Sequence, residues 1–150
     1  MSEESSRITP VPDGNWELHA PAVAPNVHVM RRGVVAFAAR HGASRHAQSD
    51  IALAVSEALT NSVVHAFVRQ PAGTMGLLAE AAADVLRIRI TDDGSGMTSR
   101  ADSPGMGIGL HLIDQLTSSI EFHPGPRGEG TELRLRFDAP GMRRTADDLL

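Results

Sequence analysis

One stretch of the chain, residues 51–67 (IALAVSEALTNSVVHAF), constrains the fold more than any other. Its apolar residues recur at spacings of three and four, which predicts a helix with one buried face. That face consists of Ile51, Val55, Ala58, Leu59, Val63 and Ala66. On the other, polar face, Glu57 and Asn61 lie one helical turn apart and can meet one ligand. An isolated pair with this spacing is also typical of a solvated helix face, so its meaning depends on the rest of the chain.

Three glycine-containing motifs follow this helix in the sequence. They are D-D-G-S-G at residues 92–96, G-M-G-I-G-L at residues 105–110 and G-T at residues 130–131. Taken alone, D-D-G is typical of a hairpin or loop turn. The second motif lacks the G-x-G-x-x-G spacing of dinucleotide-binding folds, and the chain has no G-K-[S/T] phosphate loop. The glycines therefore indicate neither a Rossmann fold nor a P-loop.

The order of the motifs is that of a known superfamily. E-x-x-x-N, D-x-G-x-G, G-x-G-x-G and G-T resemble the N box, the two glycine boxes and the closing G-T of the GHKL, or Bergerat-fold, ATPases. The resemblance covers about residues 50–137. Within the superfamily, the sequence EALTNSVVHAF resembles the bacterial anti-sigma-factor serine/threonine kinases. This resemblance implies a domain that binds ATP together with Mg²⁺.

The resemblance also assigns the adenine pocket. It implies that Asp92 accepts a hydrogen bond from the exocyclic amine of adenine, where guanine has a carbonyl to which a carboxylate cannot donate. It implies that Thr131 supports the pocket. Gly94 and Gly96 are expected to let the backbone approach the base and sugar, because glycine has no Cβ.

Other residues are expected to bind the phosphates and the metal. Gly105, Gly107 and Gly109 lead into an expected helix, whose free N–H groups and positive dipole end favour phosphate oxygens. Mg²⁺ prefers oxygen ligands and keeps several waters, so the side-chain oxygen of Asn61 is expected to bind it beside the phosphates. Glu57, one turn earlier, is then placed to act as the general base that takes a proton from the attacking hydroxyl.

Composition limits the classes of partner and compartment. With 150 residues, of which 41% are hydrophobic and 21% charged, the chain suits one domain with a single core. Its net charge of −4 gives no general attraction to nucleic acid or to anionic membranes, so neither is expected as a partner. The chain has no cysteine, no signal-peptide pattern and no apolar run long enough to span a membrane. We expect a cytoplasmic protein.

Periodicity predicts eight elements between two irregular ends. Helices are expected over about residues 25–41, 45–67 and 108–116, with Ser44 as the N-cap of the second. Strands are expected at 15–19, 74–81, 85–91, 118–123 and 132–138. Residues 1–14 are expected to be disordered, 15–138 to form the domain and 139–150 to be a loose tail. The predicted fold is a two-layer α/β (α+β) sandwich with a mixed, mostly antiparallel sheet and helices on one face.

Three functions are compatible with these motifs. The resemblance implies an anti-sigma factor that binds a sigma factor, phosphorylates an anti-anti-sigma (STAS-type) partner and forms a homodimer. An alternative is a non-catalytic, ATP-dependent regulatory binding protein. The catalytic domain of a histidine kinase is less favoured, since no helix with a phosphoacceptor histidine is expected before residue 25. Residues 97–104, with Arg100 as their only basic residue, form a shorter segment than the lid of the resembled kinases, which bears on phosphotransfer more than on ATP binding.

Overall fold

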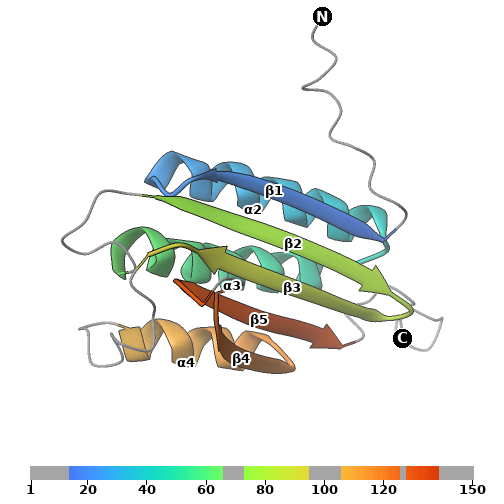
Figure 1. The fold of residues 1–150 in the computed structure, drawn as a ribbon. Coiled ribbons are helices and arrows are strands. Elements are labelled where there is room, and N and C mark those ends of the chain that lie inside the picture. Colours follow the sequence, from blue (N-terminus) through green and yellow to red (C-terminus); the bar gives the residue numbers. More distant parts are fainter. Residues whose placement is uncertain (1–13, 66–72, 95–105, 126–127, 139–150) are drawn as a thin grey trace, which may run out of the picture.

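The computed structural model describes residues 14–65, 73–94, 106–125 and 128–138. These residues form five strands and three helices, in the order β1 (Asn15–Pro21), α2 (Ala24–Arg40), α3 (Arg45–His65), β2 (Thr74–Ala82), β3 (Val85–Asp92), α4 (Met106–Leu116), β4 (Ser119–Pro124) and β5 (Thr131–Asp138). The strands make one sheet, ordered β1-β2-β3-β5-β4, and every neighbouring pair is antiparallel. The helices lie on one face of the sheet (Figure 1). The predicted two-layer sandwich is thus confirmed.

The core lies between the sheet and the helices. In β3, Leu86, Ile88 and Ile90 are buried while Arg87 and Arg89 are exposed, which is the alternation expected of a strand with one covered face. In β5, Leu133, Leu135 and Phe137 are buried in the same way, whereas Arg134 and Asp138 are exposed. From the helix layer, the core receives Met30, Val34, Phe37, Ile51, Val55 and Leu59. Burial of these side chains fixes which face of each strand points toward the helices.

Two local features hold the helices in place. Ser44 caps α3, because its Oγ accepts a hydrogen bond from the Ala47 N–H at 3.0 Å, as the sequence predicts. Gly33 lies in α2 against Trp16 of β1, where an added Cβ would stand 2.3 Å from the indole Cζ2. Glycine at this position lowers the stability of the helix by about 1 kcal/mol relative to alanine. It also leaves room for the Trp16 ring, so the helix can pack closely on the first strand.

Some boundaries differ from the prediction. Strand β1 continues to Pro21 instead of ending at residue 19, because it pairs with β2 along its whole length and proline is tolerated on an edge strand. Helix α4 begins at Met106, two residues before the expected start, so that Gly107 and Gly109 lie inside its first turn. In the described residues, no helix is long and apolar enough to cross a membrane.

Candidate functional site

The site motifs meet at one end of the sandwich. Asp92 is the last residue of β3 and Thr131 is the first of β5, and their Cα atoms are partners in the antiparallel register. The C-terminal end of α3 and the first turn of α4 lie at the same end of the molecule, at the left of Figure 1. The fold therefore brings together segments that are far apart in the sequence.

Asp92 has a buried carboxylate that is held by three donors. Its residue is only 5% exposed. The Ser62 hydroxyl donates to Oδ2 at 3.2 Å, and the Gly94 N–H donates to Oδ1 at 3.0 Å. The backbone N–H of Thr131 donates to the same carboxylate. Both carboxylate oxygens are thus fixed in direction before any ligand arrives.

Burial sets the protonation behaviour of Asp92. Loss of hydration raises the pKa of its carboxyl group, and the neighbouring charge of Asp93 raises it further. The hydrogen bonds from Gly94, Ser62 and Thr131 lower the pKa, but they do not offset the burial, and the net shift is upward. The carboxylate therefore lies in a region of low polarity, where a hydrogen bond from a ligand has a large effect.

Ser62 is a site residue that the sequence reasoning missed. It is buried on α3 one turn after Ala58, within the apolar face, and its Oγ lies 3.5 Å from the Ala58 carbonyl oxygen and 3.2 Å from Asp92. A hydroxyl on an apolar helix face was the available signal, because a buried polar group requires a partner. The identity of that partner depends on how α3 packs on β3.

Asn61 is buried, although the sequence placed it on the polar face of α3. The residue is 6% exposed, and its Nδ2 atom has no hydrogen-bond partner among the described residues. A buried donor without a partner is unfavourable by about 1–3 kcal/mol, so such a group is expected where a ligand completes the site. Glu57, one turn earlier on α3, is half-buried. The solvated-face interpretation is thus wrong for Asn61.

Gly130 allows the loop before β5 to touch β3. Its φ is +76°, and an added Cβ would lie 1.9 Å from the carbonyl oxygen of Asp92. Both facts require glycine, and they explain why G-T is found at this point of the chain. Gly130 therefore allows the close approach that places Thr131 opposite Asp92 in the sheet.

The remaining predicted residues belong to the second glycine box and its surroundings. Gly107 and Gly109 contribute backbone to the first turn of α4, where N–H groups have no partner within the helix. Gly96 and Gly105 lie outside the described residues, as does the whole segment 97–104.

A hollow of about 350 Å³ borders the site on the other side of the sheet. It is lined by His19, Gly76 and Thr91, which lie on the face of the sheet away from the helices, and by residues 92–93 at the end of β3. The Asp92 side chain points toward the helix layer, where it meets Ser62. This hollow adjoins the motif residues but does not contain the groups that hold the carboxylate.

Comparison with protein families identifies the domain. A family model for the histidine kinase-like ATPase domain matches residues 20–137, which include every motif described above. The match covers most of the chain and agrees with the resemblance to GHKL ATPases.

Curated relatives have names that refer to sigma-factor regulation and to protein kinases. The anti-sigma F factor of Clostridium beijerinckii is 27% identical over 135 residues, which cover 83% of this chain and 94% of that protein. The serine-protein kinase RsbW of Listeria innocua is 31% identical over 121 residues, which cover 71% of this chain and 77% of that protein.

A solved structure shares the fold. It contains the RsbU and RsbW domains of a Mycobacterium tuberculosis protein and superposes with a TM-score of 0.63 at 20% sequence identity. The superposition covers 86% of this chain but only 32% of the other. This likeness concerns the fold, whereas the family model and the curated relatives concern the sequence. The chain belongs to the histidine kinase-like ATPase family, and its relatives in that family include an anti-sigma factor and a serine-protein kinase.

Proposed function

We propose that this chain is an ATP-binding anti-sigma factor with serine/threonine kinase activity toward an anti-anti-sigma (STAS-type) partner. The observation that carries the proposal is the Asp92 carboxylate, buried and held by Ser62, Gly94 and Thr131 at the meeting point of the motifs. The names of the curated relatives support the kinase and the anti-sigma parts of the proposal.

Asp92 would select adenine. Its ionised carboxylate can only accept hydrogen bonds, so it favours the exocyclic amine of adenine over the carbonyl of guanine. The donors from Ser62 and Gly94 hold the carboxylate in one orientation, which lowers the entropy lost when a base binds. The backbone of Gly94 and Gly96 and the side chain of Thr131 would form the surroundings of the base.

Asn61 would hold the magnesium ion. Its amide is buried at the site end of α3, and its oxygen would be the metal ligand. The unpaired amide nitrogen can only donate, so it fits a phosphate oxygen that arrives with the nucleotide. When bound, Mg²⁺ would neutralise charge on the phosphates during transfer. The N–H groups of Gly107 and Gly109 in the first turn of α4, with Gly105 before it, would bind phosphate oxygens.

Glu57 would act as the general base. It lies one turn before Asn61 on the same helix, so the two side chains project toward the same region. Glu57 would take the proton from the serine or threonine hydroxyl of the partner as the oxygen attacks phosphorus. Such a base typically contributes about 10²–10⁴-fold to the rate.

The sigma factor and a second copy of the chain would be further partners. Strand β1 is an edge of the sheet, and α2 beside it exposes Val29, while Val23 precedes α2. Among the described strands, none pairs with the outer edge of β1, and such an edge next to exposed apolar side chains suits an association between protomers. We propose this surface for the homodimer.

The decisive experiment is transfer of labelled phosphate. The chain is incubated with ATP labelled at the γ-phosphate and with candidate partner proteins, and label on the partner is measured. The proposal expects phosphoserine or phosphothreonine on one partner. ATP that only changes the affinity for a partner, with no transfer to any of them, would replace the kinase with a non-catalytic switch.

A further inference from the structure

Asp93, the residue that follows β3, is bonded to the first residue of β2. Its Oδ1 accepts a hydrogen bond from the Thr74 N–H at 2.9 Å. Its own N–H donates to the Thr74 carbonyl oxygen at 3.3 Å. The last register pair of the two strands is Met75 with Asp92, so both bonds lie one step beyond the ladder. We call this pair of bonds the Asp93–Thr74 clamp.

The clamp lies where the chain turns back toward the side chain of Asp92. Directly after Asp93, the Gly94 N–H donates to Oδ1 of Asp92 at 3.0 Å, which closes a turn between a side chain and the backbone two residues later. On the β5 side, an added Cβ at Gly130 would stand 2.9 Å from the Cα of Asp93. Asp93 is therefore held between β2 and the loop before β5, and the place of the Gly94 donor depends on it.

The side chain of Asp93 has two effects that can be separated. As an acceptor it holds the Thr74 N–H, and an asparagine oxygen could do the same. As a charge it acts on the neighbouring carboxylate. Burial is the main cause that raises the pKa of Asp92, and the charge of Asp93 adds to it. Aspartate and asparagine at position 93 should therefore hold the turn alike but differ in their effect on Asp92.

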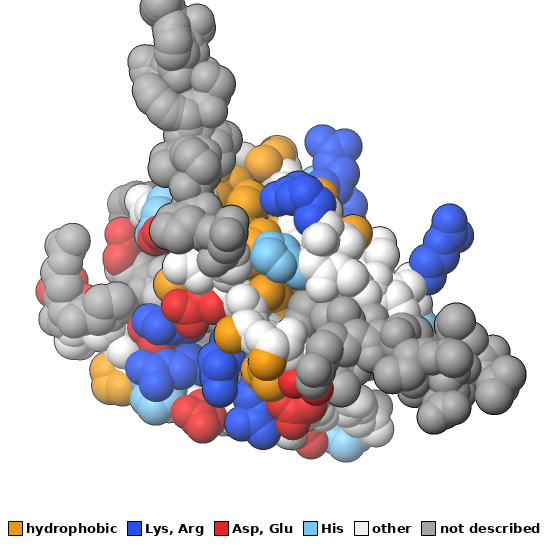
Figure 2. Space-filling model, turned by 90° about the vertical axis from the view of Figure 1, so that its right-hand side faces the viewer, with side chains coloured by type: hydrophobic (Ala, Val, Ile, Leu, Met, Phe, Trp, Pro, Cys, Tyr) orange, Lys and Arg blue, Asp and Glu red, His pale blue; other side chains and the backbone are white. Residues whose placement is uncertain are grey.

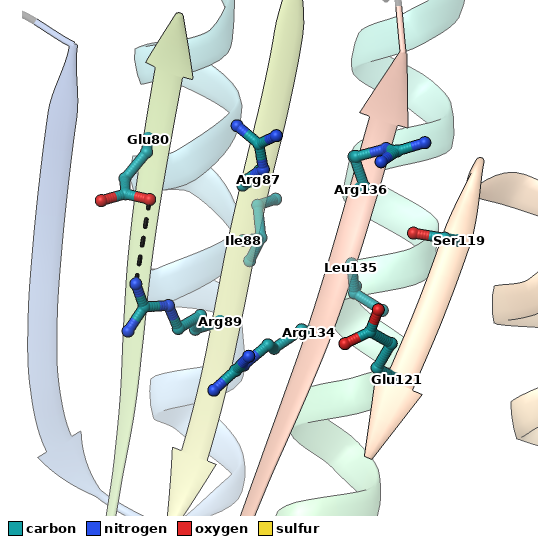
Figure 3. A pocket seen from close by; sticks show the side chains of 9 residues that line it. All are labelled: Glu80, Arg87, Ile88, Arg89, Ser119, Glu121, Arg134, Leu135 and Arg136. Carbon is teal, nitrogen blue, oxygen red and sulfur yellow. Dashed lines mark ion pairs between the residues drawn. The ribbon is translucent and has the colours of Figure 1, made fainter. Parts of the chain in front are cut away.

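Among the residues that the structure describes, none forms an ion pair with Asp93. Arginines farther along the same sheet face are paired with other carboxylates: Arg89 with Glu80, Arg134 with Glu132 and Arg136 with Asp138. Figure 3 shows the first of these pairs, and Figure 2 shows acidic and basic side chains mixed on the side away from the helices. The ionisable side chains that line the hollow beside Asp92 are instead three carboxylates and one histidine, namely Asp92, Asp93, Glu129 and His19. The charge of Asp93 thus acts on Asp92 without a paired arginine.

We infer that Asp93 is a positioning residue of the proposed nucleotide site, which through its clamp to Thr74 holds Asp92 and Gly94 in the arrangement that receives adenine. The inference rests on the proposed role of Asp92. A group that binds a ligand has to be held within about 0.5 Å of its productive position by the residues behind it. Without the clamp, the turn over residues 92–94 is free to move, and ordering it on binding costs affinity.

The test is a double-mutant cycle on the full chain, measured by titration calorimetry with ATP. Asp93→Ala removes the acceptor and the charge, whereas Asp93→Asn removes the charge alone. Asp92→Asn alters the carboxylate on which the clamp acts, and the double variant Asp92→Asn/Asp93→Ala completes the cycle. The control is Asp84→Ala, which makes the same substitution in the turn at the opposite end of β2 and β3.

We expect Asp93→Ala to weaken ATP binding roughly fivefold, as loss of one hydrogen bond that orders the site predicts. Asp93→Asn should recover most of this loss, and Asp84→Ala should bind ATP as the wild type does. In the Asp92→Asn background, Asp93→Ala should cause little further loss, because the group that it positions is already altered.

The pH dependence of binding reports the charge of Asp93. Asparagine at this position removes one of the causes that raise the pKa of Asp92, while burial remains. ATP binding, which requires an ionised Asp92, should therefore persist to a lower pH in Asp93→Asn than in the wild type. Glu129 and His19 beside the hollow, and the phosphates of ATP, titrate in both proteins, so the difference between the two curves belongs to Asp93.

Several results would overturn the inference. Losses that add in the double variant would mean that Asp93 acts independently of Asp92, and equal losses in Asp93→Ala and Asp84→Ala would mean a general effect on the two strands. Asp93→Asn as weak as Asp93→Ala, with a pH curve like that of the wild type, would exclude both effects of the side chain. Normal ATP binding by Asp93→Ala would overturn this inference alone, whereas a wild type that does not bind ATP would overturn the proposed function as well.

Discussion

Ser62 on α3 and Asp92 on β3, thirty positions apart in the chain, share a hydrogen bond of 3.2 Å that joins the helix layer to the end of the sheet. The serine hydroxyl holds the orientation of the carboxylate proposed to bind adenine. We predict that Ser62→Ala weakens ATP binding by roughly fivefold, since one neutral donor contributes about 1 kcal/mol. Titration calorimetry measures this loss, and Ser49→Ala, on the exposed side of the same helix, should change nothing.

Asp92→Asn should weaken ATP binding by roughly ten- to hundredfold, because it removes a charge-assisted hydrogen bond from a buried pocket. The amide can also offer a donor, so discrimination between ATP and GTP should narrow. Calorimetry with both nucleotides checks the two statements. Unchanged ATP affinity in this variant would remove Asp92 from the adenine pocket.

Asp92 should also make the free energy of unfolding of the ligand-free protein depend on pH. The unfolded carboxyl group titrates near its ordinary pKa of 3.8, whereas burial raises the pKa in the folded state. Between the two values the folded state keeps a proton that the unfolded state has lost. The contribution of Asp92 to the free energy of unfolding is therefore full below pH 3.8 and declines as the pH rises through the folded pKa. Urea titrations of the wild type and of Asp92→Asn at a series of pH values check this. As the pH rises through this range, the wild type should lose stability relative to the variant.

Glu57→Gln and Asn61→Ala should separate catalysis from binding. Glu57→Gln keeps the shape of the side chain but removes the base, so we expect Mg-ATP binding to persist while phosphotransfer falls by about 10²–10⁴-fold. Asn61→Ala removes the proposed metal ligand and should lower binding and transfer together. Binding titrations beside single-turnover transfer assays distinguish these outcomes. Equal transfer by wild type and Glu57→Gln would exclude Glu57 as the base.

Gly130 and Gly128 form a matched pair for a test of the loop. Both have positive φ angles, +76° and +82°, but a Cβ at Gly130 would meet the Asp92 carbonyl oxygen at 1.9 Å, while one at Gly128 would meet nothing within 4 Å. Gly128→Ala should lower stability by about 1–2 kcal/mol through backbone strain alone. Gly130→Ala should lower it further and weaken ATP binding, because Thr131 moves away from Asp92. Thermal unfolding and calorimetry report the two effects.

Local patterns were sufficient to predict the elements and their buried faces. Alternation in β3 identified Leu86, Ile88 and Ile90 as inward-facing, and helical spacing identified Ile51, Val55 and Leu59. These predictions succeed because each helix or strand shows its buried face in the spacing of its own apolar residues.

Relations between distant elements could not be predicted in the same way. The partner of Ser62 depends on the packing of α3 against β3, and the reason for Gly33 depends on where Trp16 lies. The start of α4 was misplaced because glycine disfavours helices locally, whereas Leu110 and Ile113 pack against the core and favour the helix through tertiary contacts. The motifs of the family are enough to predict the site residues, whereas their burial and hydrogen bonds depend on how the elements pack together.

The strand order β1-β2-β3-β5-β4 has a consequence for the newly made chain. Strand β5 is the last of these strands to be synthesised, yet it lies between β3 and β4. Until Thr131–Asp138 leaves the ribosome, β3 has an unpaired edge, Asp92 lacks the donor from Thr131, and β4 has no neighbour in the sheet. The nascent protein therefore cannot complete the pocket proposed for the nucleotide. Pairing between segments this far apart in the chain is also slow relative to helix formation. During this interval the unpaired edge of β3 is exposed to pairing with strands of other chains.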